Sequence, residues 1–375
     1  MMMRRSFISL LSVLVLLGAC TIQPPLYLRE TLAVEVELKP QDDVDRMWQP
    51  DWRSLWTFRW SEDALGPLGY KVPPSFRAHV YPLDERGAHA RHDVYNFFGL
   101  TTEFPVVFGH YDFLFHNNDS EVLLFSTAEG TVDDVFCNTR IFSRGLKAST
   151  PVSTVQQKRQ SGAAKADADI EIEEPVALMP DALFSCLDAN RLIPSDLSQY
   201  TRREYRYVLR IEELLYPATY IHLVQVRLVN NDGRVIGSPS GAALTGVADG
   251  VNLSARVSAA ATVSVPSDVY MDRERDMLAT RVLSFGIPGC DPYDPKSVAA
   301  TSSRHFLVLN VAYDNGSHRN IRIDITDQFR ALPLGGVIDL ELDVDDFPPE
   351  GGAEGGFEAL IEDWTEETGH ATIIN

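Results

Sequence analysis

The sequence predicts an all-β protein built from β-sandwiches, and three observations support this. Apolar and polar residues alternate with a period of two in many short segments, as expected of strands with one buried face. Turn-forming sequences rich in Asn, Asp and Gly separate several of these segments. Helical periodicity is scarce and does not alternate with the strands, which argues against a parallel α/β sheet.

The predicted strands begin after residue 30. In the first of them the apolar residues Leu32, Val34, Val36 and Leu38 alternate with Ala33, Glu35, Glu37 and Lys39. Further strands are expected at 76–81, 122–125, 220–229, 306–313, 321–325 and 337–344. Turns are expected at 231–233, 314–316 and 334–336, and short helices only around 180–189 and 327–331.

The length of 375 residues is sufficient for two ordinary domains after a leader. We expect a signal peptide at 1–19, a lipidated tether at 20–30, an N-terminal β-sandwich domain at 31–200 and a C-terminal β-sandwich domain at 201–375. Residues 147–175 lack aromatic side chains and a clear apolar face for most of their length. This composition predicts a flexible surface loop within the first domain.

The first twenty residues have the order of features of a secretion signal. Arg4 and Arg5 precede an apolar run that is too short to span a bilayer. The stretch Leu17-Gly18-Ala19-Cys20 resembles a bacterial lipobox, in which small residues enter the signal peptidase and the cysteine thiol is acylated. The alternative is an ordinary signal peptide with an incidental cysteine. Acyl chains such as palmitate on Cys20 would anchor the protein to a membrane, which is its first expected partner.

The charge and the cysteines limit the remaining classes. The formal net charge is −20, so nucleic acid is a poor partner and the charge is expected to keep the protein soluble. If Cys20 is lipidated, an odd number of cysteines is left, namely Cys137, Cys186 and Cys290, without C-x-x-C spacing. We expect them to be buried thiols that bind no metal.

No motif in the sequence indicates catalysis, so the chain is predicted to be no enzyme, with no catalytic residues and no cofactor. The segment 237–241 resembles a nucleophile elbow but has proline in place of the nucleophile, and no phosphate-binding loop occurs. His89 and His92 lie in a polar turn, which makes a zinc site the weaker interpretation. The acidic run 343–346 lacks the spacing of a calcium loop.

Four tryptophans recur at every fourth position, at Trp48, Trp52, Trp56 and Trp60. Pro50 and the β-rich segment 56–60 argue against one continuous helix. Within a strand Trp56 and Trp60 would share one face. A buried position in the core is the favoured interpretation, and an exposed platform on which a glycan stacks is the alternative.

Several segments together resemble the fimbrillin-like lipoproteins of Bacteroidetes, which include type V pilus subunits and many relatives of unknown function. The resemblance rests on GHYDFLFHNN at 109–118, SGAALTGVA at 240–248, DITDQF at 324–329 and the region 355–364. It spans nearly the whole chain after the signal and agrees with the lipobox. None of these motifs is catalytic.

The resemblance implies a fold, a place and a function. The fold is two tandem transthyretin-like Greek-key sandwiches, carried by an outer-membrane lipoprotein that faces the cell surface or the periplasm, or that enters a fimbrium. The function is that of a non-enzymatic pilus subunit, a tip or anchor component, or an adhesin, whose partners are other fimbrial subunits or surface glycans. The alternative is a glycan-binding surface lipoprotein that uses exposed aromatic residues.

Pilins of this family lose an N-terminal strand to an arginine-specific protease, and a strand of another subunit fills the groove. By this resemblance Leu32 to Leu38 is the candidate removable strand and Arg46 the candidate cleavage site. The segment Ala371 to Ile374 is the candidate donor strand. The simpler alternative is that the first and last strands complete the sheets of their own chain.

Overall fold

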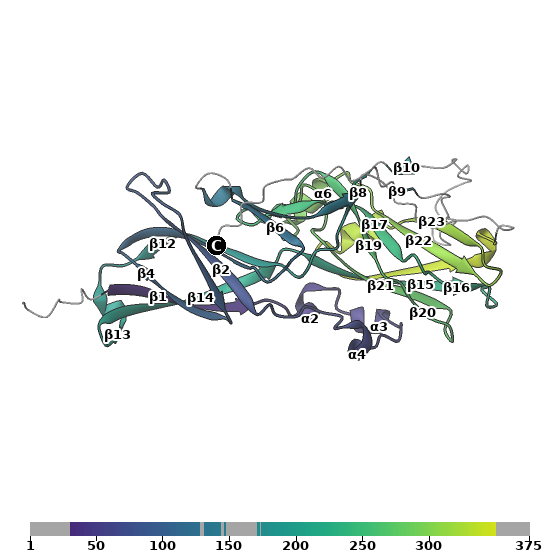
Figure 1. The fold of residues 1–375 in the computed structure, drawn as a ribbon, viewed down its shortest axis with the longest axis horizontal. Coiled ribbons are helices and arrows are strands. Elements are labelled where there is room, and N and C mark those ends of the chain that lie inside the picture. The colour runs from purple at the N-terminus through teal and green to yellow at the C-terminus, as the bar shows by residue number, and fades with distance from the viewer. Residues whose placement is uncertain (1–30, 128–130, 144–145, 148–170, 173, 350–375) are drawn as a thin grey trace, which may run out of the picture.

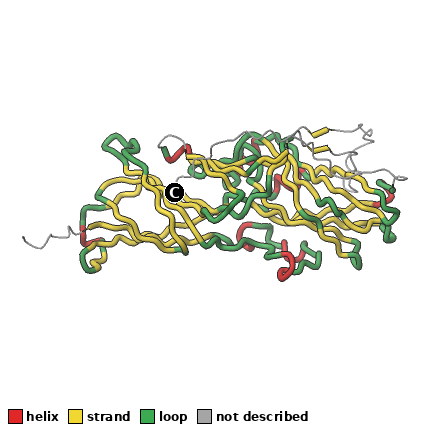
Figure 2. Tube along the Cα trace, viewed as in Figure 1, coloured by secondary structure: helices red, strands yellow, loops and turns green. Residues whose placement is uncertain are grey.

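The structure is a computed structural model that describes residues 31–127, 131–143, 146–147, 171–172 and 174–349. Strands dominate it and helices are few and short, so the chain is all-β as predicted (Figure 2). The molecule is elongated, and its two bodies of strands follow one another along its long axis (Figure 1). In the described part of the chain no helix has the length and apolar character needed to cross a membrane.

The first body contains β1 (Thr31–Pro40), β2 (Ser75–Pro82), β3 (Asp93–Phe98), β4 (Thr101–Val106), β5 (Gly109–Asn117), β12 (Phe184–Ile193), β13 (Thr201–Arg203) and β14 (Arg206–Pro217). They form one path, β3-β2-β5-β12-β14-β1-β4, with β13 beside β14. β12 and β14 pair through two residues of each strand only, 184–185 with 216–217. The path therefore folds over at this point into two layers, and Phe104 of one layer packs against Phe113 of the other, with ring centroids 5.8 Å apart.

The second body is also a sandwich. One layer contains β8 (Ile141–Ser143), β11 (Val176–Ala177), β16 (Val235–Gly237), β17 (Ala242–Ala248), β19 (Thr262–Ser267), β22 (Phe306–Tyr313) and β23 (His318–Asp324), and the other β15 (Tyr220–Val229), β20 (Tyr270–Asp272), β21 (Met277–Ser284) and β24 (Gly336–Asp343). Apolar residues of both layers form one buried cluster between them.

Smaller elements complete the structure. β6 (Leu123–Thr127), β7 (Val135–Thr139) and β18 (Gly250–Asn252) form a three-stranded sheet, and β9 (Leu146–Lys147) pairs with β10 (Glu171–Ile172). The helices are α2 (Val44–Met47), α3 (Trp52–Leu55), α4 (Glu62–Leu65), α6 (Pro295–Ala300) and α7 (Thr326–Ala331), with 3-10 turns η1 (Val132–Asp134), η2 (Leu197–Gln199) and η3 (Val344–Asp346).

The strands expected at 32–38, 76–81, 122–125, 220–229, 306–313, 321–325 and 337–344 are confirmed, with ends that move by up to three residues, and α7 confirms the helix expected at 327–331. The β-rich segment 56–60 is not a strand, because the N–H groups of Thr57 and Phe58 bind the side chain of Gln225 and not a neighbouring strand. The helix expected around 180–189 is wrong, because β12 occupies residues 184–193. Its apolar residues have helical spacing, but pairing with β5 and a bulge between Asp188 and Arg191 place them on a sheet. Tertiary pairing thus overrides the local pattern.

The expected domain boundary near residue 200 falls between two strands that pair with each other, β12 and β14. Residues of the predicted first domain also contribute β8 and β11 to a sheet of the second body. The chain therefore passes between the two bodies more than once. Most of the predicted loop at 147–175 lies outside the described residues.

Candidate functional site

The candidate removable strand, β1, lies inside a sheet and not at its edge. It runs parallel to β14 over all ten of its residues, from Thr31 opposite Arg206 to Pro40 opposite Leu215. On its other side Leu32 to Glu37 pair antiparallel with β4. Removal of β1 would therefore leave a slot with an unpaired strand edge on each side, which is the geometry that a β-strand from elsewhere can fill.

The inward face of β1 belongs to the core of the first body. Val34, Val36 and Leu38 are buried and pack in one cluster with aromatic residues of both layers. Burial of an apolar side chain of this size contributes roughly 1.5–3 kcal/mol. Cutting the chain after β1 would therefore not release the strand by itself, because these contacts and both hydrogen-bonded edges remain.

The outward face of β1 carries charges that pair across the neighbouring strands. Glu35 accepts from Arg203 of β13 at 2.6 Å, and this hydrogen bond lowers the pKa of Glu35. Glu37 pairs with Arg210 of β14, and Lys39 pairs with Glu212. The alternation seen in the sequence is thus apolar inward and ionic outward.

Arg46, the candidate cleavage site, lies in α2, a single helical turn that begins four residues after β1. Its side chain is 78% exposed and forms an ion pair with Asp43 at 3.2 Å. Arg53 differs, because its guanidinium makes two hydrogen bonds to Asp45 and lies 4.5 Å from the ring centre of Trp52. Arg46 is therefore the less restrained of the two arginines.

The segment after Arg46 is fixed along the second body. We call residues 48–70 the strap, which includes α3 and α4 (Figure 1). At its start Trp48 is buried against Gly335, where φ is +92° and a Cβ would lie 2.3 Å from the carbonyl oxygen of Ile221. Gln49 binds the backbone of Val337 through both ends of its amide, at 2.8 and 3.2 Å. Position 335 therefore needs glycine.

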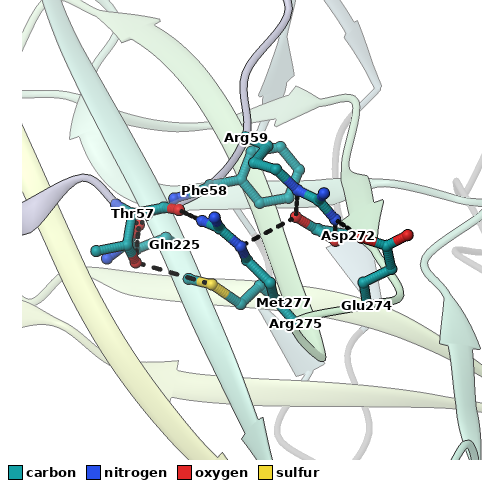
Figure 3. Close-up of polar contacts among 8 residues, drawn as sticks. All are labelled: Thr57, Phe58, Arg59, Gln225, Asp272, Glu274, Arg275 and Met277. Atoms are coloured by element: carbon teal, nitrogen blue, oxygen red, sulfur yellow. Dashed lines mark hydrogen bonds and ion pairs between the residues drawn. The ribbon is translucent and has the colours of Figure 1, made fainter.

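The middle of the strap is held by one buried amide, that of Gln225 on β15 (Figure 3). Its Oε1 accepts from the backbone N–H groups of Thr57 and Phe58 at 2.9 and 3.2 Å. Its Nε2 donates to the carbonyl of Leu55 and to the carboxylate of Asp339, both at 2.8 Å. Each polar atom of this side chain is thus used, and the strap is fixed to the centre of a sheet.

Charged groups hold the rest of the strap. Arg59 makes two hydrogen bonds of 2.6 Å to Asp272 and contacts Glu274 at 2.7 Å, and Arg275 donates to the carbonyl of Thr57 at 2.5 Å (Figure 3). Near the end of the strap Arg281 donates to the carbonyls of Leu68 and Gly69. The sequence reasoning missed the strap, and the only signal for it was the density of tryptophan.

The structure places both candidate glycan-stacking residues in this strap. Trp56 and Trp60 are half-buried, with ring centroids 6.2 Å apart at an interplanar angle of 62°. Trp60 also packs edge-on against Tyr270, and its Nε1 donates to the carbonyl of Gly66. The two rings therefore do not form one flat platform, and glycan stacking on them stays a prediction.

Three sets of predicted residues lie outside the described part of the chain. They are the lipobox residues Leu17, Gly18 and Ala19 with Cys20, the tether at 20–30, and the candidate donor strand Ala371 to Ile374. The structure gives no contact for them.

The turn that contains His89 and His92 takes part in a row of imidazoles. His79 Nδ1 lies 2.8 Å from His92 Nε2, and His79 Nε2 lies 2.9 Å from His116 Nε2. His116 Nδ1 is 2.8 Å from the carbonyl oxygen of Asn117 and must donate to it. With all three imidazoles neutral, this sets the direction of the row: His79 donates to His116, and His92 donates to His79.

Burial reinforces this neutral state. It lowers the pKa of His79 to about 2, with the neighbouring imidazoles His116 and His92 as further causes, and that of His116 to about 4. His89 is separate and pairs with Asp112 at 2.8 Å. Across residues 31–349, where described, no group of three or more His, Cys, Asp or Glu is arranged to hold a metal ion.

The cysteines and a pocket between β12 and β14 offer little chemistry. Cys137, Cys186 and Cys290 are free and buried, as expected, and burial raises the pKa of each thiol. A pocket of about 350 Å³ opens where β12 and β14 diverge, and Glu213 and Arg256 line it. Burial and the carboxylate of Asp188 raise the pKa of Glu213.

Comparison with known proteins gives similarity only among solved structures. No family model matches the chain, and no curated protein matches it. A Bacteroides ovatus protein provisionally assigned as an adhesin is 13% identical, with a TM-score of 0.49 over 87% of this chain and 94% of that chain. The fimbrial anchor protein Mfa2 of Porphyromonas gingivalis is 12% identical, with a TM-score of 0.44 over 84% and 90%.

A Bacteroides thetaiotaomicron structure, provisionally assigned to polysaccharide-binding proteins of the group DUF1812, is 7% identical, with a TM-score of 0.41 over 84% of this chain and 91% of that chain. The identities are too low for the similarity to transfer a ligand or an assembly partner.

Proposed function

We propose that the protein is a non-enzymatic surface lipoprotein of fimbrillin-like type, which acts as a subunit, tip or anchor component of a fimbrium or as a related adhesin. The observation that carries the proposal is the position of β1. The first described strand is central in its sheet and fully paired on one side, and an exposed arginine follows it six residues later. Loss of this strand would create a binding groove for another subunit.

The strap gives the proposal a physical basis. It begins two residues after Arg46 and is anchored to β15, β21 and β24. A chain cut after Arg46 would therefore keep its new end fixed while β1 becomes a separate peptide. Two sandwich bodies would then stay joined by the strap and by β14, which runs directly into β15.

Attachment and fold detail complete the proposal. Acylation of Cys20 would anchor the protein to the outer membrane, with residues 20–30 as the tether between the lipid and β1. The transthyretin-like Greek-key arrangement of both bodies belongs to the same proposal. Glycan binding by Trp56 and Trp60 is the alternative function. The angle of 62° between the two rings does not favour it, because a sugar stacks on a flat surface.

The first test is limited digestion of the purified mature chain with an arginine-specific protease. We expect cleavage after Arg46 before cleavage after Arg53, because α2 is one turn long and unwinds at little cost. N-terminal sequencing should find a fragment that begins at Met47. Once mild denaturant has released β1 and the protein has been refolded, it should give a ladder of oligomers on a native gel. Arg46→Gln should remain uncut at this position.

Arg53→Gln is the matched control, since it removes a nearby arginine and should leave cleavage at Arg46 intact. A wild-type chain that stays uncut at Arg46 and monomeric would overturn the removable strand. Protease shaving of intact cells tests the location independently. Loss of the protein on shaving supports exposure on the cell surface, and full survival in the outer-membrane fraction places it on the periplasmic side.

A further inference from the structure

The groove that β1 would leave between β14 and β4, here called the β1 groove, is lined by charges that favour a particular pattern of charges in its occupant, here called the charge code. We propose that the groove selects, as its occupant, an extended segment of another subunit with carboxylates at two alternating outward positions and apolar residues between them. The inference rests on the proposed function, because it requires β1 to be replaceable. It goes further in naming the chemistry of the partner strand.

The first argument is the charge that β1 leaves behind. Its outward neighbours on β13 and β14 include Arg203, Arg206 and Arg210, and Glu35 and Glu37 of β1 satisfy two of these arginines. Arg206 pairs instead with Glu103 of β4, at 2.7 Å. Loss of β1 would also free Glu212 from Lys39. The empty groove would then present the three arginines against the carboxylates of Glu103 and Glu212, in a chain whose net charge is −20. A strand with carboxylates restores the pairing that β1 provides.

The second argument is the way in which Arg203 connects both edges of the groove. Glu35 of β1 lies directly opposite Glu103 of β4, a placement of like charges that is unfavourable by itself. Arg203 contacts both carboxylates, at 2.6 and 3.6 Å. The arginine thus makes an acidic residue acceptable at the position of Glu35. A lysine there would lie opposite Glu103 but would also face two guanidinium groups, those of Arg203 and Arg210.

The third argument is register. The inward positions of Val34, Val36 and Leu38 are fully buried, so a slip by one residue would move carboxylates into the core. Charge and apolar pockets therefore favour the same alignment, parallel to β14 and antiparallel to β4. The segment Ala371 to Ile374 has no carboxylate. By this charge code it should bind the groove more weakly than a strand that carries carboxylates at the positions of Glu35 and Glu37.

The test uses the mature chain cut after Arg46 and three labelled ten-residue peptides. One has the sequence of residues 31–40, one carries glutamine at positions 35 and 37, and one carries lysine at both. Uptake is followed by gel filtration and fluorescence anisotropy at low salt. An exposed ion pair changes affinity by up to about fivefold. The lysine peptide loses two ion pairs and adds repulsion, so its affinity should be about 10- to 100-fold lower than that of the peptide with the sequence of residues 31–40. The affinity of the glutamine peptide should lie between the two.

Two further measurements identify the cause. Arg210→Glu should reduce or reverse the preference, because Arg210 is 62% exposed and its replacement leaves the core unchanged. Arg227→Glu, on β15 of the other body, is the matched control and should leave the preference as it is. The preference should also shrink in about 1 M salt, where the Debye length falls to about 3 Å.

The outcomes separate the two ideas. Equal uptake of all three peptides would overturn the charge code and leave the removable strand intact. Uptake of no peptide, even when the released β1 fragment has been removed in mild denaturant and the protein refolded, would overturn the proposed function and the charge code with it. Preference for the lysine peptide would also overturn the code.

Discussion

Lowering the pH from 7 to 4.5 is expected to remove most of the free energy of unfolding. Four histidines, His79, His116, His222 and His305, are at most 1% exposed. Burial is the main cause that lowers the pKa of His79 to about 2 and of the other three to about 4. In the unfolded chain the pKa of each histidine is about 6.5, so the unfolded chain binds protons at a pH where the folded state does not.

The direction follows from linkage. Above pH 6.5 both states hold neutral imidazoles, so the stability is fully present. Below pH 6.5 the unfolded state binds more protons, and each histidine removes up to about 1.4 kcal/mol per pH unit until the pH reaches its folded pKa. At pH 4.5 the four residues together account for a loss of roughly 10 kcal/mol, which is comparable with the whole stability of an ordinary domain.

Urea unfolding at several pH values between 7.5 and 4.5 measures this loss. His305→Leu should reduce the slope by about 1.4 kcal/mol per pH unit, because it removes one buried group and keeps an apolar contact with Phe329. His110→Leu, at an exposed position of β5, is the control and should leave the slope nearly unchanged. A stability that is flat between pH 7 and 4.5 would refute the account.

Replacement of Gln225 by methionine is expected to destabilise the protein by about 4 kcal/mol. Methionine fills a similar volume but leaves the N–H groups of Thr57 and Phe58 and the carbonyl of Leu55 without their partner. The bond from Phe58 is buried and those with Thr57 and Leu55 are part-buried, and a polar group left unsatisfied in the interior costs about 1–3 kcal/mol. The strap should also separate from β15 locally, so amide hydrogen exchange at Thr57 and Phe58 should accelerate.

Arg227→Met is the matched control on the same strand. Arg227 is half-exposed and pairs with Glu341 at 3.8 Å, so its loss should cost less than about 1 kcal/mol. Urea unfolding of both variants and hydrogen exchange of the strap give the comparison. If the stability of Gln225→Met differed from the wild type by no more than that of Arg227→Met, the strap would not depend on this amide.

The strap links this prediction to the proposed function. A subunit that exchanges its first strand must keep the chain fixed on the far side of the cut. The contacts of Trp48 and Gln49 and the hydrogen bonds of Gln225, here called the clamp, hold the chain within a dozen residues of Arg46. Weakening the clamp should therefore affect the cut protein more than the intact one, since β1 no longer helps to hold the strap.

The sequence by itself determined the all-β class and the positions of seven strands, among them β1, β15, β22 and β24, because an alternation of period two is a local consequence of one buried face. It did not predict the twelve-residue β14 or the eight-residue β21. It also identified β1 as apolar on one side and charged on the other, and Arg46 as a candidate site. The segment at 184–193 was predicted incorrectly because Leu183, Phe184 and Leu187 have helical spacing, and only pairing with β5 decides otherwise.

Only the tertiary structure decided that β1 is a central strand, parallel to β14 and antiparallel to β4. It also decided that Glu35 meets Arg203, that Gln225 holds the strap, and that His79, His92 and His116 form one row. The physical reason is the same in each case. These partners lie from 13 to about 170 residues apart, and the pairing of strands so distant is set by the packing of the whole core and not by any local pattern.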